Sequence, residues 1–183
     1  MNSKTKIGIA LLIIVLILIG ILIKEGRQTN FNKNYQPVQP IAFSHKVHAG
    51  DNDIQCLYCH YGAEKGRHAN IPPTELCLNC HNNIKKDSTE IVKIKDSLKE
   101  NRPIHWVKVN HFPDYAYFNH SQHVMIGKVS CVECHGNIGS MGRVKQENEL
   151  NMGMCLNCHR EKGISPPNDH KSKAGGDCAR CHY

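Results

Sequence analysis

The sequence predicts a mostly irregular chain with short α-helices, preceded by one N-terminal transmembrane helix. Three observations lead to this fold class. All ten cysteines of the 183 residues fall in five copies of one short motif. Residues Ile7–Ile23 carry no polar side chain, whereas the remainder is poor in aromatic residues, which make up 6% of the chain. Glycine, asparagine and proline are frequent between the motifs, which favours short helices joined by loops.

The repeated motif is C-x-x-C-H, the attachment signature of c-type haem. Two thiols three residues apart lie on one side of a helical turn, where each forms a thioether with a haem vinyl group. The histidine that follows ligates the iron from the proximal side. The predicted thioether cysteines are Cys56, Cys59, Cys77, Cys80, Cys131, Cys134, Cys155, Cys158, Cys178 and Cys181, and the predicted proximal ligands are His60, His81, His135, His159 and His182.

Zinc and disulfides are the alternative interpretations of paired cysteines. Structural zinc needs four ligands, usually from two C-x-x-C pairs at a matched separation. The five pairs here are odd in number, and a histidine follows every one of them. Disulfides would not require that histidine. The pattern therefore favours five covalently bound haems.

Five haems would change both the core and the charge of the chain. Their porphyrin faces would supply most of the core, so removing haem is expected to unfold the domain. The formal charge is +7, but five haems carry ten propionates, which ionise at neutral pH and bring the total to about −3. Lysine and arginine are scattered without a basic stripe. The composition therefore gives no indication of nucleic-acid binding.

Residues 1–23 are predicted to be a membrane anchor with a transmembrane helix over residues 7–23. At about 1.5 Å per residue the apolar run reaches roughly 25 Å, enough for a thin bilayer. A cleaved signal peptide is the alternative, but its apolar region is shorter and ends at a small-x-small site. Neither property fits this run, and no cysteine lies nearby for a lipoprotein. Lys4 and Lys6 favour a cytoplasmic N-terminus.

The chain beyond the anchor contains an internal duplication. Phe43-Ser44-His45-Lys46-Val47-His48 recurs in related form as Phe118-Asn119-His120-Ser121-Gln122-His123, and each copy stands at the same distance before a haem motif. The C-L-N-C-H motif at Cys77 recurs at Cys155, after a slightly longer interval. We therefore divide the chain into a tether (24–40), a first two-haem module (41–81), a connector (82–117), and a second two-haem module with the fifth haem site (118–183).

The connector is predicted to begin with a helix over Asp87–Glu100. Asp87 is the expected N-cap, with Glu90 three residues later, and Asn101-Arg102-Pro103 ends the helix. Ile91, Ile94 and Leu98 share one face. A short extended segment, Ile104–Val109, carries the only tryptophan and packs over haem edges or a partner, unless the connector is a plain spacer.

Eight histidines lie outside the five motifs, and the candidates for distal iron ligands come from them. Residues three apart on a helix share a face but diverge slightly, so each H-x-x-H pair can serve two haems. We expect His45 and His120 to serve the haems at Cys56 and Cys131. His68 is expected to serve the haem at Cys77, while His48 and His123 reach haems outside their own pair.

The second module lacks a counterpart of His68, because Arg143 stands at the equivalent position. His170 is one candidate ligand for the last two haems, and Met141 and Met152 are others. A methionine ligand would raise the reduction potential of its haem relative to haems with two histidines. His105 and His111 rank below these residues as ligands.

The two-histidine units resemble those of class III multihaem cytochromes. More specifically, Phe43–His81 and Trp106–Arg160 are similar to the pentahaem cytochrome subunit of alternative complex III, a bacterial quinol:electron-acceptor oxidoreductase. The resemblance is carried by F-S-H-K-V-H-A-G, H-A-N-I-P-P, W-V-K-V, F-P-D-Y-A-Y-F-N-H-S-Q-H-V and N-M-G-M-C-L-N-C-H-R. These segments cover well over half of the chain beyond the anchor.

The resemblance implies an electron-transfer subunit without catalysis of its own. Electrons from quinol oxidation would pass through its haems to a monohaem cytochrome c or a terminal oxidase. The implied partners are iron–sulfur and polytopic quinol-binding membrane subunits. Because covalent haem attachment takes place outside the cytoplasmic membrane in bacteria, the haem domain is expected on the periplasmic or outer side, with a single pass through the inner membrane.

Two other functions remain open at this point. A multihaem reductase of a small oxyanion would need an iron with an open position, whereas five regular motifs and surplus histidines favour saturated irons. An anchored quinol dehydrogenase of the tetrahaem type shares the anchor but lacks the duplicated pattern and the extra haem. Quinol oxidation by the isolated chain would favour this second alternative.

Overall fold

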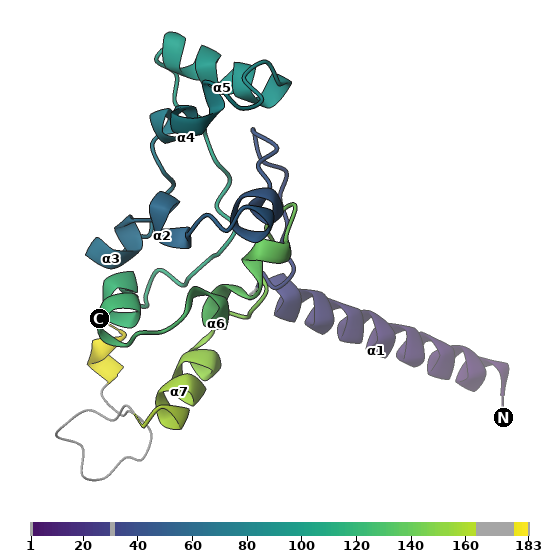
Figure 1. Ribbon diagram of the computed structural model, residues 1–183. Coiled ribbons are helices and arrows are strands. Elements are labelled where there is room, and N and C mark those ends of the chain that lie inside the picture. Colours follow the sequence, from purple (N-terminus) through teal and green to yellow (C-terminus); the bar gives the residue numbers. More distant parts are fainter. Residues whose placement is uncertain (1, 30–31, 164–177, 183) are drawn as a thin grey trace.

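The computed structural model describes residues 2–29, 32–163 and 178–182 (Figure 1). Among these residues there is no β-strand, only an isolated bridge between Ala116 and His182. The mostly irregular, helical fold class predicted from the sequence is confirmed for these ranges. The elements in order are α1 (Ser3–Thr29), η1 (Lys46–Asp51), α2 (Cys56–Cys59), α3 (Gly62–Lys65), α4 (Thr74–His81), α5 (Thr89–Lys99), η2 (Gln122–Ile126), α6 (Cys131–His135), η3 (Ile138–Ser140), α7 (Met152–Glu161) and η4 (Cys178–Arg180).

Helix α1 projects away from the rest of the molecule (Figure 1). Its stretch Lys4–Lys24 is long and apolar enough to cross a membrane, and none of it is buried against other parts of the chain. The helix extends beyond Ile23 to Thr29, into the segment predicted to be the tether. Lysine, glutamate, arginine and glutamine dominate this extension, and all four are good helix formers.

The tether is not a free linker, because its second half is bonded to the body. The backbone N–H of Asn34 donates to the Gln146 carbonyl at 2.7 Å, and the backbone N–H of Gln146 donates to the Tyr35 carbonyl at 2.9 Å. The Gln39 side-chain amide pairs with both the N–H and the carbonyl of Val107, at 2.9 and 2.8 Å. An amide can bond a backbone in this way because it has a donor and an acceptor.

The two predicted modules have matching elements. In the alignment of the duplicated segments, η1, α2, α3 and α4 of the first module correspond to η2, α6, η3 and α7 of the second. Both η1 and η2 are π-helical, a conformation that is rare and occurs frequently at functional sites. The same sequence pattern therefore gives the same succession of short helices twice.

The N-cap of helix α5 lies one residue later than predicted. Its N-cap is Ser88, whose hydroxyl accepts from the backbone N–H of Ile91, so the prediction of Asp87 as the cap was wrong. The extended Ser88 backbone places its hydroxyl at the first turn, which suits an N-cap residue. The helix ends at Lys99, and residues 104–109 contain no regular element.

Ordinary side chains form only a small core, as the composition predicted. Ile41, Ile91 and Ile94 make up a buried cluster, with partly buried side chains packed against it from α4 and the connector: Cys77, Leu78, Ile104 and Trp106. The tryptophan of the connector thus packs within its own chain. The cluster fixes α5 beside the motif of α4.

Replacing Ile94 with alanine is expected to destabilise this region. Ile94 is 5% exposed, and truncating a buried isoleucine to alanine costs about 2–5 kcal/mol. The measurement is thermal unfolding of the haem-loaded protein. Val92→Ala on the same helix is the matched control, because Val92 is 43% exposed. Equal effects of the two changes would contradict the assignment of this core.

Candidate haem-binding sites

Each C-x-x-C-H motif begins on, or lies within, a short helix. Four motifs lie on α2, α4, α6 and α7, and the fifth lies on η4. The ten thiols are all free. Helical spacing brings the two thiols of each pair to one side of a turn, as the attachment chemistry requires. The local structure at all five motifs is therefore compatible with two thioether bonds to one porphyrin.

Four histidine rings of these motifs each face a second histidine ring. The ring centres are 6.4 Å apart for His45 and His60 and 6.3 Å for His120 and His135, and these rings are parallel within 7°. The His48–His81 and His123–His159 separations are 6.0 and 6.1 Å. Two metal–imidazole bonds of roughly 2 Å, plus the distance from nitrogen to ring centre on each side, give about 6 Å. The separations therefore fit one iron between each pair.

The histidines that face the motif histidines are contacted by two phenylalanines. The sequence had predicted no role for these phenylalanines. The Phe43 ring meets His45 edge-on at 4.8 Å and stacks on His48 at 4.3 Å. Phe118 repeats these contacts, at 4.8 and 4.6 Å, with His120 and His123. One aromatic ring thus orients two imidazoles in different directions. The recurrence of phenylalanine just before each H-x-x-H pair was the available signal.

In six histidines, Nδ1 is hydrogen-bonded to a backbone carbonyl. This bond leaves Nε2 of each ring to face away from that carbonyl. The ligand histidines of metal sites usually have their second nitrogen held in this way. The pairs are His48 with Ser44, His60 with Asn70, His81 with Ile84, His120 with Arg67, His123 with Asn119, and His182 with Tyr115, at 2.6–3.2 Å. In His111 it is Nε2 that pairs with a carbonyl, that of Lys108 at 3.1 Å, which disfavours it as an Nε2 ligand.

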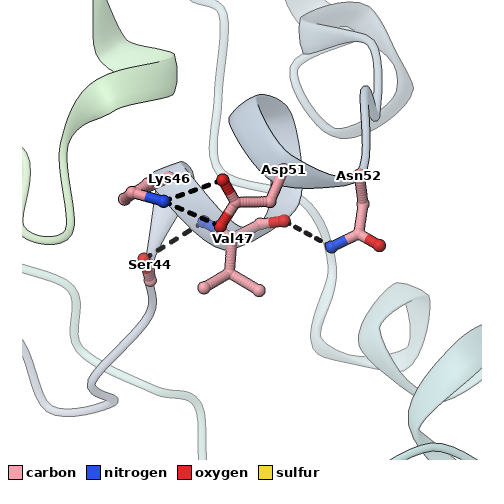
Figure 2. Close-up of polar contacts among 5 residues, drawn as sticks. All are labelled: Ser44, Lys46, Val47, Asp51 and Asn52. Atoms are coloured by element: carbon pink, nitrogen blue, oxygen red, sulfur yellow. Dashed lines mark hydrogen bonds and ion pairs between the residues drawn. The ribbon is translucent and has the colours of Figure 1, made fainter.

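Polar contacts hold the π-helical turn that carries His48 (Figure 2). The Lys46 ammonium pairs with the Asp51 carboxylate at 2.8 Å. The Val47 N–H donates to the Ser44 hydroxyl at 3.3 Å, and the Asn52 amide donates to the Val47 carbonyl at 2.6 Å. These contacts join residues that precede His48 in the chain to residues that follow it. They favour one orientation of its ring.

The fifth motif is held by the end of the connector. Ala116 forms a bridge with His182, and the Tyr117 N–H donates to the Cys181 carbonyl. The Tyr115 ring stacks on the His182 ring at 5.8 Å. Arg67 donates to the Ala116 carbonyl at 3.5 Å and lies 4.7 Å from the centre of the Tyr117 ring. The first module and the connector therefore both contact the region of the fifth site.

The structure places a histidine of the same module opposite each of His81 and His159. His48, and not His68, lies opposite His81, and His123 lies opposite His159 within its own module. His68 is exposed and precedes Ala69, whose carbonyl approaches α3. Met152 is 59% exposed at the start of α7, and the Met141 carbonyl accepts from the Lys46 N–H. His105 is exposed beside Trp106, and His170 lies outside the described residues.

Burial keeps several of these imidazoles neutral. The pKa of His45 falls to about 4, because burial and then the neighbouring His60 and His48 disfavour its protonated form. Burial also lowers the pKa of His135, with His120 and His60 adding to the effect, and burial and His123 lower that of His159. Nδ1 of His45 is buried without a hydrogen-bond partner in the structure. Neutral imidazole is the form that binds iron.

The donor set fits haem better than a bare metal ion. Within the described ranges, no group of three or more histidine, cysteine, aspartate or glutamate side chains is placed to hold a metal ion. Haem iron needs only two axial ligands from the protein, because the porphyrin supplies the other four. A pair of facing imidazoles beside two free thiols matches this requirement.

Helical C-x-x-C-H motifs with facing histidines define a multihaem c-type cytochrome. The chain belongs to the family of cytochrome c7 and related cytochromes c, which matches residues 41–99 and 116–183. Covalently bound haem c is the cofactor of this family.

The chain is also similar to a multihaem cytochrome c subunit of a quinone reductase. The chain is 31% identical over 159 residues to the protein named "menaquinone reductase, multiheme cytochrome c subunit" of Nitratidesulfovibrio vulgaris (strain Hildenborough). The match covers 80% of this chain and 69% of that protein. Both comparisons therefore identify the chain as a multihaem c-type cytochrome.

Acid is expected to destabilise the protein through these histidines. A histidine with a lowered pKa in the folded state takes up its proton mainly on unfolding, so stability is lost as the pH falls from 6.5 toward about 4. The measurement is the thermal midpoint of the haem-loaded protein between pH 7.5 and 4. His45→Met, which removes one titrating group, should reduce the slope. A midpoint independent of pH would contradict the burial of these rings.

Proposed function

We propose that the chain is the five-haem electron-transfer subunit of a quinone-linked membrane oxidoreductase. One observation carries this proposal. In four motifs, the histidine ring faces a second histidine ring. An iron with imidazole on both sides has no open position for a substrate, so it exchanges electrons without binding one. This feature favours electron transfer over reduction of a small oxyanion.

The proposed axial ligand pairs follow the ring contacts. His60, His81, His135 and His159 would be proximal ligands, with His45, His48, His120 and His123 opposite them. His182 would be the proximal ligand of the fifth haem. The candidates for its distal ligand are His68, His170, Met141 and Met152. Each haem would supply one-electron oxidation and reduction, while the protein sets its potential through these ligands and their burial.

The membrane helix and the relative support a complex built at the membrane. Helix α1 would anchor the chain with a single pass, leaving the haem domain on the periplasmic side. The proposed partners are iron–sulfur and polytopic quinone-binding subunits, with a monohaem cytochrome c or a terminal oxidase as acceptor. This is the arrangement of alternative complex III, in which electrons leave quinol.

In a second candidate function, electrons flow in the opposite direction. The relative is named a reductase of menaquinone, which favours transfer from a cytochrome toward the quinone. Both candidates use the same haems and the same anchor. They differ in whether the complex reacts faster with quinol and an oxidised cytochrome or with quinone and a reduced one.

Replacing His48 with alanine is expected to convert one haem from six-coordinate low-spin to five-coordinate high-spin iron. The reason is that its ring lies 6.0 Å from that of His81, as a distal ligand would. Electron paramagnetic resonance of the oxidised protein measures the change. His111→Ala is the matched control, since Nε2 of His111 is already bonded to a carbonyl. A high-spin signal from the control alone would contradict the proposed pairing.

Purification from native membranes in mild detergent tests the function as a whole. Co-purification with iron–sulfur and polytopic subunits, and five haems per chain, is the expected result. Assays of the complex with quinol and with quinone then decide the direction. Isolation of the chain alone, with haems still reduced by quinol, would overturn the proposal in favour of a free-standing quinol dehydrogenase.

A further inference from the structure

The two modules meet through equivalent contacts. The Lys46 N–H donates to the Met141 carbonyl at 2.9 Å, and the Ser121 N–H donates to the Gly66 carbonyl at 3.1 Å. The two donors occupy equivalent positions of the duplicated segments, and so do the two acceptors. Reciprocal contacts of this kind define an approximate two-fold relation between the modules, as in a symmetric dimer.

Helices η1 and η3 make one side of this interface, and η2 and α3 make the other. On the first side, a Cβ at Gly50 would collide with the carbonyl oxygen of Gly139, so the two backbones touch directly. On the second side, the Arg67 carbonyl accepts from both the N–H and Nδ1 of His120, at 3.4 and 2.8 Å. The interface is therefore close-packed on both sides of the approximate axis.

The sites at Cys56 and Cys131 lie next to this interface. His120, which faces His135 of the Cys131 motif, is bonded through Nδ1 to the Arg67 carbonyl of the first module. On the other side, His45 faces His60 of the Cys56 motif, and the next residue, Lys46, is bonded to the Met141 carbonyl of the second module. The two equivalent sites are therefore the central pair.

The remaining motifs extend outward from this pair. The Asn79 amide of α4 donates to the Tyr58 hydroxyl of α2 at 3.2 Å, so the motif on α4 adjoins that on α2. The Lys162 ammonium at the end of α7 pairs with the Glu133 carboxylate of α6 at 3.0 Å, so the motif on α7 adjoins that on α6. Figure 1 shows α4, α2, α6 and α7 following one another from the top of the view to the bottom.

The fifth motif continues the second arm. The Tyr117 N–H donates to the Cys181 carbonyl, and the next residue, Phe118, stacks on His123, which faces His159 of α7. The bridge between Ala116 and His182 holds η4 at the end of the connector, next to the second module. The row of motifs is thus longer by one site on the side of α7 than on the side of α4.

We propose that the five haem sites form one unbranched row in the spatial order Cys77, Cys56, Cys131, Cys155 and Cys178, with the Cys77 and Cys178 sites as the two points where electrons enter and leave. This inference rests on the proposed function. The order differs from that of the sequence, because η1 and α3, which flank the first motif, contact the second module. Redox partners would accordingly contact the surface beside α4 at one end and beside η4 at the other.

The test uses two histidines of one turn as a matched pair. His45→Met changes the axial ligand at the Cys56 site, which has two neighbours in the proposed row, whereas His48→Met changes it at the terminal Cys77 site, which has one. Adjacent haems influence each other's potentials because a unit charge acts strongly at short range. Electron paramagnetic resonance during a redox titration of the full-length protein in detergent follows each haem signal.

The expected result is that His45→Met shifts the midpoints of two other haems and His48→Met shifts that of one. Shifts of one haem by His45→Met, or of two by His48→Met, would overturn the proposed order. Because the protein is examined without partners, the outcome is independent of which complex contains it. Failure of the function would appear instead as a missing complex in the native purification.

A pair of haem-deleted variants covers the case in which a methionine variant does not accumulate. Cys77→Ala with Cys80→Ala removes a terminal site, and Cys178→Ala with Cys181→Ala removes the other. Each is expected to leave four haems, with one remaining signal altered. If the two deletions alter the same remaining signal, or if either alters more than one, the row is not as proposed.

Discussion

The opposition of two imidazole rings at about 6 Å is the constraint on which the rest of the structure depends. Four such pairs are present, although the described residues include few buried apolar side chains that could position them. The rings of His48 and His123, which face motif histidines, are fixed locally by Phe43 and Phe118 and by backbone carbonyls. Short-range contacts thus substitute for a large core, which is consistent with a domain completed by its porphyrins.

The π-helical turns explain how one short segment aims two histidine rings in different directions. In an α-helix, residues three apart lie on nearly one face. The wider π-helical turn spreads His45 and His48 further apart in direction, and Phe43 contacts both. Each ring is thereby aimed at a different motif, His60 in one case and His81 in the other. Pairing within a module follows from this local geometry.

Motifs that repeat could be predicted from the sequence, whereas contacts between segments could not. Cysteine spacing indicated the helical haem-binding turns, and the constant offset between the duplicated segments indicated matching modules. Which ring faces His81 depends on how η1 lies against α4, and spacing does not encode this. The sequence therefore led us to expect His68 at the Cys77 haem, whereas the ring of His48 faces His81 in the structure. Ser88 and Asp87 are both good N-cap residues, and only the backbone distinguished them. The bonds of Gln39 to Val107 join residues 68 apart and had no local signal.

The bonding of the tether limits how far the haem body can lie from the end of α1. Helix α1 ends at Thr29, and the backbone of Asn34 is already bonded to Gln146 of the second module. Five peptide steps span at most about 18 Å when fully extended. If α1 anchors the chain as proposed, an arm this short would keep the haem body near the membrane. Its redox partners would then have to approach it or be assembled beside it.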